Sequence, residues 1–428
     1  MNIGIFVLIV FFGCLALGIP IAFALGMGTV LAVLIYDPFP MDLVIQTYFT
    51  SGDTFPLLAV PFFILAGDIM LQGGISNRLV NFAQTLLGNL TGALGIITVV
   101  TCMVFASISG SGPATTAAIG GLLIPAMVKE GYDVGYASSL AAASGALGPV
   151  IPPSICFIIY GVIAQVSITD LFIAGIIPGM VIAAILVVFV YITSKKNNFG
   201  IKKEKASIKE RFVAFNEAKW SLLIPVIILG GIYGGIVTPT EAAIIACDYG
   251  LIISLFVYKE ITLRDIPRIF SRSALTTGMV IILVSTATAF GKLLTIAMIP
   301  QALSNLILGI SSNVIIVLIL INVLLLVTGM FMETLAAIII LSPLLLAIVE
   351  PLGVSPVHFG IIMTTNLVIG MCTPPVGVNM FVASGIANIQ VERMFKWLIP
   401  FILVLIFGLL IINVFPQLSL FLVGVLAK

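Results

Sequence analysis

Charged residues are scarce in this chain. Asp, Glu, Lys and Arg make up 8% of its 428 residues, and 61% of the residues are hydrophobic. Soluble globular proteins carry about 25% charged residues. Several apolar runs exceed the roughly 20 residues with which a helix spans a bilayer. The runs are continuous rather than alternating, which favours helices over a β-barrel. The composition therefore excludes a water-soluble globular protein and predicts an all-α polytopic membrane protein.

Histidine and paired cysteines are also lacking. His358 is the single histidine, which excludes a His-based metal cluster within the chain, and we expect it to lie at the surface in a loop. The net charge of +1 gives no indication of nucleic-acid binding. The cysteines stand singly in apolar segments without CxxC spacing, so we expect reduced, buried side chains at Cys14, Cys102, Cys156, Cys247 and Cys372.

Basic residues are absent before Arg78. The N-terminal apolar run therefore lacks the basic segment of a cleaved signal peptide, and we expect it to be a retained membrane segment. Residues 2–36 are long enough for two short spans broken at Gly18-Ile19-Pro20, or for one long tilted helix. Residues 37–53 are expected to form an acidic loop.

Two apolar stretches in each half of the chain are interrupted by Gly, Pro and small polar residues. Non-helical backbone at membrane depth needs hydrogen-bond partners from protein or from a water-filled cavity, so such breaks usually mark a binding site. The alternative is that small residues only allow helices to pack closely. We predict the tips of re-entrant helical hairpins at residues 107–113 and 329–334, and the unwound centres of broken helices at residues 145–153 and 370–375.

The breaks recur at a spacing of about 220 residues, because Pro152-Pro153 aligns with Pro374-Pro375 and Pro125 with Pro343. The loop after the first apolar run carries only acids, whereas the corresponding loop of the second half carries Lys259, Arg264, Arg268 and Arg272. Because basic loops stay in the cytoplasm, corresponding loops lie on opposite sides of the membrane. We therefore predict two inverted-topology repeats.

The predicted domains are a first repeat at residues 1–194, a basic cytoplasmic linker at 195–219 and a second repeat at 220–428. A lipid-binding or regulatory role of the linker is an alternative to a simple solvated connection. Residues 397–414 are predicted to form a late span, after which the C-terminus lies outside the cytoplasm.

The breaks offer oxygen atoms with little formal charge. Backbone carbonyls with one or two Ser hydroxyls form a hard-oxygen site that suits Na⁺ better than a divalent metal. Helix N-termini beside them present free N–H groups, which suit a carboxylate of a substrate. Glu333 stands at the second hairpin tip, opposite Asn366, and an acid at membrane depth is a functional hypothesis in itself. We expect it to help hold a second Na⁺; the alternative is a protonated side chain bonded to backbone. Asn379 could cap the following half-helix or offer its amide oxygen.

Four further ionisable residues stand in apolar surroundings: Asp68, Glu241, Asp248 and Lys292. For Glu241 we favour a place in the first turn of a helix with Thr240 as N-cap. Lys292 lies in an interrupted apolar run at residues 287–298. As a lone cation it could attract an anionic substrate or pair with an acid, and the sequence leaves both open.

Taken together, several segments resemble the large membrane subunit of tripartite ATP-independent periplasmic (TRAP) transporters. They are GIPIAFALG, DTFPLLAVPFFILAGDIM, ASISGSGPAT, ALGPVIPPS, IVTPTEAA, GMFMET and NLVIGMCTPPVGVN, and the resemblance extends over essentially the whole chain. The resemblance implies an elevator-type, Na⁺-coupled importer in the bacterial inner membrane, and no enzyme. It also implies a separate small four-helix membrane subunit and a periplasmic substrate-binding protein. That protein delivers an organic acid such as a dicarboxylate, a sugar acid or sialic acid.

The resemblance also implies site residues. One sodium site corresponds to Ser107, Ser109, Gly148, Ile151 and Pro153. The other corresponds to Gly329, Glu333, Gly370, Thr373 and Pro375. We expect the substrate to contact Ser111, Gly112, Ser144, Gly145, Asn366, Asn379 and Lys292.

Three other functions are alternatives to this one. A stand-alone Na⁺-coupled anion symporter would need no binding protein. A passive channel could also be built from carbonyl-lined breaks. A membrane-embedded enzyme would need a catalytic pair or a His-rich metal motif at depth, and the sequence has neither.

Overall fold

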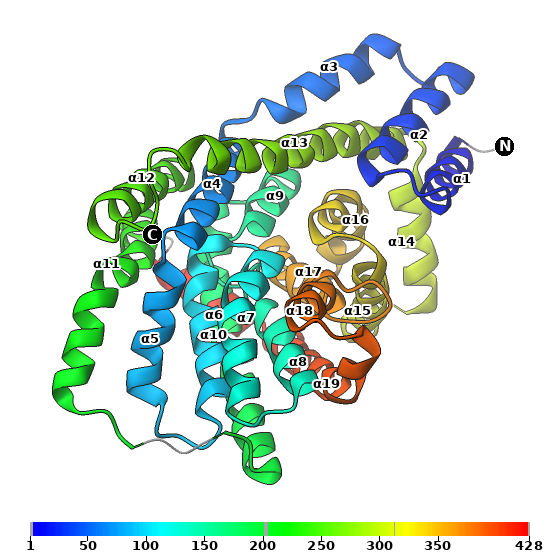
Figure 1. Cartoon of the computed structure of the whole chain (residues 1–428). Helices are drawn as coiled ribbons and strands as arrows, with labels where there is room; N and C mark the ends of the chain where they lie inside the picture. Colours follow the sequence, from blue (N-terminus) through cyan, green and yellow to red (C-terminus); the bar gives the residue numbers. More distant parts are fainter. Residues whose placement is uncertain (1–2, 201–203, 312, 427–428) are drawn as a thin grey trace.

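The structure is a computed structural model that describes residues 3–200, 204–311 and 313–426 (Figure 1). Within these ranges it contains α-helices, short 3₁₀ and π turns and no strand. Eight helices among the described residues are long and apolar enough to cross a membrane. The all-α prediction is therefore confirmed.

Twelve α-helices of the described residues lie outside the two predicted break regions of each half. They are α1 (Ile3–Ala16), α2 (Ile21–Tyr36), α3 (Met41–Gly52), α4 (Ala59–Gln72), α5 (Ile75–Leu87), α10 (Ile168–Asn197), α11 (Ile208–Tyr233), α12 (Pro239–Ile252), α13 (Ile266–Ile296), α14 (Ile299–Ile310), α19 (Phe395–Val414) and α20 (Gln417–Leu426).

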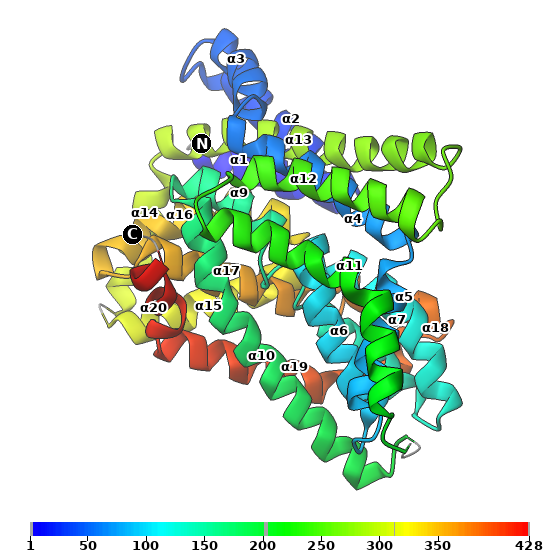
Figure 2. The same cartoon turned by 90° about the vertical axis from the view of Figure 1, so that its left-hand side faces the viewer.

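The break regions form the interior. They comprise α6 (Ala93–Ser109), α7 (Gly112–Lys129), α8 (Val134–Gly145), α9 (Ile155–Ala164), α15 (Val314–Phe331), α16 (Thr334–Val349), α17 (Pro356–Gly370) and α18 (Val378–Ala387). Figure 1 shows α11, α12 and α13 running along the outside of this group. In the turned view of Figure 2, the long helix α10 crosses the molecule obliquely, and it packs against α6, α17 and α19.

The N-terminal run is divided into two helices, which decides between the two sequence alternatives. Gly18 adopts φ +78°, a left-handed conformation that glycine reaches without steric cost. Pro20 stands at the N-cap of α2 and contributes no backbone N–H. The chain therefore turns between α1 and α2, and the two helices pack against each other.

The prediction of an acidic loop at residues 37–53 is wrong, because most of this segment is α3. Pro40 precedes the helix with φ −57°, and Asp42 lies in the first turn, where an acid complements the positive end of the helix dipole. Val44 and Thr47 are buried, since one face of α3 packs against α13. The segment therefore forms a helix although it carries acids, because one of its faces packs against α13.

The predicted linker is largely helical. Helix α10 continues to Asn197, and α11 already begins at Ile208. A capping box starts α11: Glu210 N donates to Ser207 Oγ, and Ser207 N donates to the Glu210 carboxylate. The predicted boundary at residue 220 therefore falls inside a continuous helix; residues 201–203 of the linker lie outside the described residues.

Two predictions about single ionisable residues need correction. Glu241 lies in the first turn of α12 as expected, but the N-cap is Thr238 rather than Thr240, with both halves of a capping box present. His358 is no surface loop residue. Pro356 starts α17, which places His358 in its first turn, 2% exposed, with Nδ1 3.1 Å from Ser419 Oγ of α20.

Candidate functional site

The first hairpin consists of α6 and α7 joined by a two-residue turn. Gly110 ends α6 with φ +58°, and its N–H donates to Ala106 O. Hydroxyl groups close the turn: Ser109 Oγ lies 2.8 Å from Thr115 Oγ1, which donates to Ser111 O at 2.8 Å. Ser107 and Ser109 are both buried. The tip is therefore an oxygen-rich turn at the predicted position.

The first broken helix consists of α8 and α9, with irregular backbone from residue 146 to 153. Ser154 starts α9 by accepting the N–H of Phe157, and its hydroxyl donates to Pro149 O. This hydroxyl bridges the unwound segment to the next half-helix. Leu147 O accepts from the N–H groups of Val150 and Ile151, whereas the prolines of the segment have no N–H to donate.

The hairpin tip is in close backbone contact with the unwound segment. A Cβ on Gly148 would lie 2.5 Å from Ser111 O and 2.9 Å from Gly112 N, and one on Gly110 would lie 2.9 Å from Pro153 O. No larger residue fits at these contacts without moving backbone. Glycine is thus required for the two elements to bring their backbone groups together.

The second hairpin and broken helix repeat this contact. The chain turns from α15 to α16 through Met332 and Glu333, and Glu333 is the N-cap of α16 without a capping hydrogen bond from its side chain. Its side chain is exposed. A Cβ on Gly370, at the end of α17, would lie 2.5 Å from the carbonyl carbon of Gly329. The hydroxyl of Thr373 donates to Ile369 O and closes the start of the second break.

The two breaks meet at Asn379 of α18. Its Nδ2 lies 3.4 Å from Ala142 O of α8, and Cys372 Sγ approaches the same carbonyl at 3.3 Å. A Cβ on Gly112 would lie 3.1 Å from both amide atoms of Asn379. Asn379 does not cap α18, because the N-cap is Gly377. Both hairpin tips and both broken helices therefore belong to one connected region, with Asn379 bridging its halves.

Several buried oxygen atoms of this region have no hydrogen-bond partner among the described residues: Thr116 Oγ1, Ser144 Oγ, Asn366 Oδ1 and Asn379 Oδ1. Burying an unpaired polar atom costs about 1–3 kcal/mol. Such a set of neutral oxygens fits an alkali cation or a hydrogen-bonding substrate. No group of three His, Cys, Asp or Glu side chains that could hold a transition metal occurs within the described part of the chain.

The structure places Asn366 of the second broken helix against α15 and Lys292 away from both tips. Asn366 donates to Asn322 O at 3.1 Å, and Asn322 donates to Asn413 Oδ1 at 2.9 Å, so the side chain of Asn366 faces α15 and α19. Lys292 lies on α13, which continues unbroken to Ile296. Its Nζ donates to Thr47 Oγ1 at 3.0 Å and approaches neither tip.

Sequence reasoning missed three polar residues of the region. Thr116 contacts the position of Gly145, whose Cβ would collide with Thr116 Oγ1. Asn322 and Asn413 form the amide chain that ends at Asn366. The signal was present for both asparagines, since each is an isolated amide within a long apolar run.

Paired helical hairpins packed against paired broken helices define a class of membrane transporters. The crystal structure of the YdaH transporter of Alcanivorax borkumensis is similar in fold, with a TM-score of 0.63 and 13% sequence identity over 87% of this chain and 86% of that one. The chain belongs to the family described as the tripartite ATP-independent periplasmic transporter, DctM component, whose model matches residues 8–418. It is thus a multi-pass permease of the bacterial inner membrane and not an enzyme.

Two relatives are similar over most of this chain. The isethionate TRAP transporter permease protein DctMQ of Oleidesulfovibrio alaskensis is 49% identical over 410 residues, which are 96% of this chain and 65% of that protein. The C4-dicarboxylate TRAP transporter large permease protein DctM of Rhodobacter capsulatus is 38% identical over 418 residues, which are 94% of each chain. The chain therefore spans just under two thirds of the first relative and nearly all of the second.

Proposed function

We propose that this chain is the large permease subunit of a Na⁺-coupled TRAP transporter that imports an organic acid. The observation that carries the proposal is the convergence of the first tip and both broken helices at Asn379, Gly112 and Ala142, which the second tip joins through the contact of Gly329 with Gly370. An ion that orders one break also positions the groups of the other through this contact. Such an arrangement couples ion binding to the binding of a second ligand.

Two Na⁺ ions are proposed, one at each contact between a tip and a break. Their ligands are drawn from the residues carried by the family resemblance. The buried hydroxyls of Ser107 and Ser109 support the first site. At the second site, Glu333 lies in the hairpin turn, and its carboxylate has no hydrogen bond to another described residue. A carboxylate with free lone pairs is a suitable ligand for a hard cation.

The proposed substrate is a small organic anion. The two relatives bear the names of isethionate and C4-dicarboxylates, which are acids with a short carbon body. Within the proposed site, Ser144 and Asn379 offer unpaired oxygens and amide groups beside the N-termini of α7 and α18. Helix N-termini favour negative charge, so a carboxylate or sulfonate is the expected ligand. The class includes dicarboxylates, sugar acids and sialic acid.

We further propose the two inverted repeats, at residues 1–194 and 220–428, with the segment 195–219 between them. A reciprocal packing supports them: α7 of the first half packs against α18 of the second, and α16 of the second packs against α9 of the first. In the proposed repeats α7 corresponds to α16, and α9 corresponds to α18. Each hairpin arm thus packs against the second half of the other repeat's broken helix. In the proposed elevator mechanism, the hairpins and broken helices move as one body against α4, α12 and α13.

The proposed partners are a small four-helix membrane subunit and a periplasmic substrate-binding protein, within surrounding lipid. The relative that extends beyond the match is named DctMQ. The name supports a second membrane component, which we propose to be the small subunit.

The experiment is uptake of radiolabelled isethionate and succinate into proteoliposomes that contain the chain and its small subunit. Each acid is offered with and without the binding protein, under an inward Na⁺ gradient or none. Accumulation that needs both Na⁺ and the binding protein is expected. Accumulation with Na⁺ alone would favour a stand-alone symporter. Uptake that only equilibrates the acid, without accumulation, would favour a channel.

A further inference from the structure

A cleft of about 630 Å³ lies between α13 and the helices α9 and α16. Its volume is in the range of sites for small molecules. It is lined by none of the residues assigned to the sodium sites, nor by any of those at the two hairpin tips. Ile339 and Pro343 of α16 form one wall, well along the helix from Glu333. The cleft is therefore separate from the convergence of the breaks.

Lys292 is the one charged residue among the described residues that line this cleft. Its ammonium group donates to Thr47 Oγ1, and no carboxylate of the described residues lies within 4.0 Å of it. Holding an uncompensated cation on a membrane-spanning helix costs free energy, and such cations mark paths for ions and substrates. Two of the three ammonium hydrogens have no described partner and are available to a ligand.

Two neutral side chains of the cleft are also free to bind. Thr54 Oγ1 is shielded and has no hydrogen-bond partner among the described residues. Gln165 ends α9 in a left-handed conformation, φ +54°, which turns the chain at the edge of the cleft. A hydroxyl and a primary amide each donate a hydrogen bond to an anionic oxygen.

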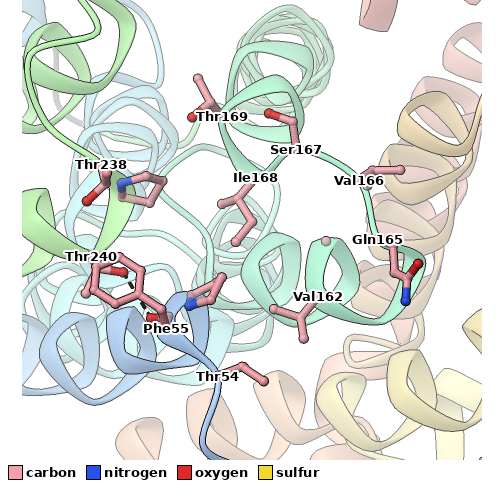
Figure 3. Close-up of a pocket in the computed structure, with 13 residues that line it drawn as sticks. Thr54, Phe55, Val162, Gln165, Val166, Ser167, Ile168, Thr169, Thr238 and Thr240 are labelled. Atoms are coloured by element: carbon pink, nitrogen blue, oxygen red, sulfur yellow. Dashed lines mark hydrogen bonds between the residues drawn. The ribbon is translucent and has the colours of Figure 1, made fainter. Parts of the chain in front are cut away.

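Thr54, Val162 and Gln165 also line a second pocket of about 450 Å³, so the two spaces adjoin. Figure 3 shows Gln165 and Thr238 on opposite sides of this pocket, with Val162 between them. Ser167, Thr169, Thr238 and Thr240 also line it, and no charged residue among the described residues does. The charged end of a ligand belongs at Lys292, and an uncharged, hydroxyl-bearing body fits the second pocket.

We propose that this cleft is a second binding site for a small organic acid, in which Lys292 binds one carboxylate or sulfonate group with Thr54 and Gln165. The one ammonium group of the cleft can neutralise one carboxylate or sulfonate group of the acid. The cleft lies between α13 and the helices α9 and α16. An acid bound there is therefore held between the moving hairpins and broken helices and the static α13, before it enters the site at Asn379 or after it leaves that site. That transport step rests on the proposed function; the anion binding does not.

Thiol labelling tests the binding directly. Thr295 lines the cleft one turn after Lys292 and is exposed, whereas all five native cysteines are buried. In the full-length chain carrying Thr295→Cys, a negatively charged methanethiosulfonate should react roughly tenfold faster, relative to a positively charged one, than in the same chain carrying Lys292→Gln. Lys292→Arg should retain the preference.

Protection by ligand distinguishes a site from a mere surface charge. Thr276→Cys is the matched control, because it follows Arg272 by one turn on the same helix outside the cleft. Isethionate or succinate should slow labelling at position 295 and leave position 276 unchanged. Equal labelling of position 295 with and without these acids, or protection that survives Lys292→Gln, would overturn the proposal.

The uptake assay separates the two proposals. Lys292→Gln should raise KM for the acid roughly tenfold and leave the Na⁺ dependence unchanged. Absence of uptake by the unaltered chain would contradict the proposed function while leaving protection at position 295 intact. Uptake by the unaltered chain with an unchanged KM in Lys292→Gln would contradict the role of the cleft in transport.

Discussion

Gly329 and Gly370 are in backbone contact across the second hairpin and the second break. A Cβ on Gly370 would lie 2.5 Å from the carbonyl carbon of Gly329, and a Cβ on Gly329 would lie 2.7 Å from Leu367 O. The neighbouring atoms are backbone, so no side-chain rotation can relieve either overlap. This contact fixes the distance between the turn that carries Glu333 and the unwound segment that follows Gly370.

Gly370→Ala should therefore separate the hairpin from the break. Overpacking of this kind costs about 1–3 kcal/mol, and we expect a lower melting temperature in detergent together with weaker Na⁺ dependence. Gly385→Ala on α18 is the matched control, because a Cβ there meets nothing within 4 Å and an alanine favours the helix by about 0.5–1 kcal/mol. Equal melting temperatures for the two variants would refute the argument.

Glu333→Gln should impair Na⁺ coupling more than folding. The amide keeps the size of the side chain but removes the charge that the proposed second ion needs. We expect the Na⁺ concentration for half-maximal uptake to rise by roughly tenfold or more, with little change in melting temperature. Glu350→Gln, at the opposite end of α16, should leave the Na⁺ dependence unchanged. An unaltered Na⁺ dependence in Glu333→Gln would remove the residue from the site.

Asn322→Leu should destabilise the protein through the amides that it leaves behind. It removes the amide that donates to Asn413 Oδ1 and one of the two acceptors of Asn366 Nδ2, whose bond to the backbone carbonyl of residue 322 remains, and an unpaired buried amide group costs about 1–3 kcal/mol. Thermal unfolding in detergent measures the loss. The double variant Asn322→Leu/Asn413→Leu should cost less than the sum of the single variants, because the second change removes a group that the first left unpaired. Simple additivity would mean that the amides act independently.

Thr238→Ala should weaken the start of α12. The hydroxyl accepts the N–H of Glu241, and the loss of such an N-cap costs about 1 kcal/mol. Thr238→Ser keeps the acceptor and should melt close to the unaltered protein. Because Thr238 also lines the pocket beside the Lys292 cleft, the melting temperature is the measurement that tests the cap. A selective loss of uptake in Thr238→Ala without a loss of stability would instead indicate a role in transport.

Sequence alone located the hairpin turns and the unwound segments, because Gly, Pro and Ser interrupt helices for local reasons. Gly110 needs a positive φ, and Pro153 has no N–H to donate. Such requirements act within a few residues, so they are visible without a structure. The same locality explains why Glu241 was correctly placed in the first turn of a helix.

The positions of Asn366 and Lys292 could not be inferred in this way. Both were expected at the substrate site, but Asn366 bonds Asn322 on another helix, and Lys292 faces a cleft beside α16. Which face of a helix meets which neighbour depends on packing over the whole chain. Helix α3 was missed for a related reason: contact with α13 stabilises a segment whose acids suggested a loop.

The reciprocal packing of α7 with α18 and of α16 with α9 has a consequence for synthesis. The ribosome completes α7 and α9 long before it reaches residue 334, where α16 begins, and α18 follows later still. Until then, the glycine-lined turn at Gly112 lacks Asn379, and the surface of α9 that α16 covers has no cover from its own chain. These surfaces of the first half must therefore be shielded by the insertion machinery or by lipid until translation is nearly finished.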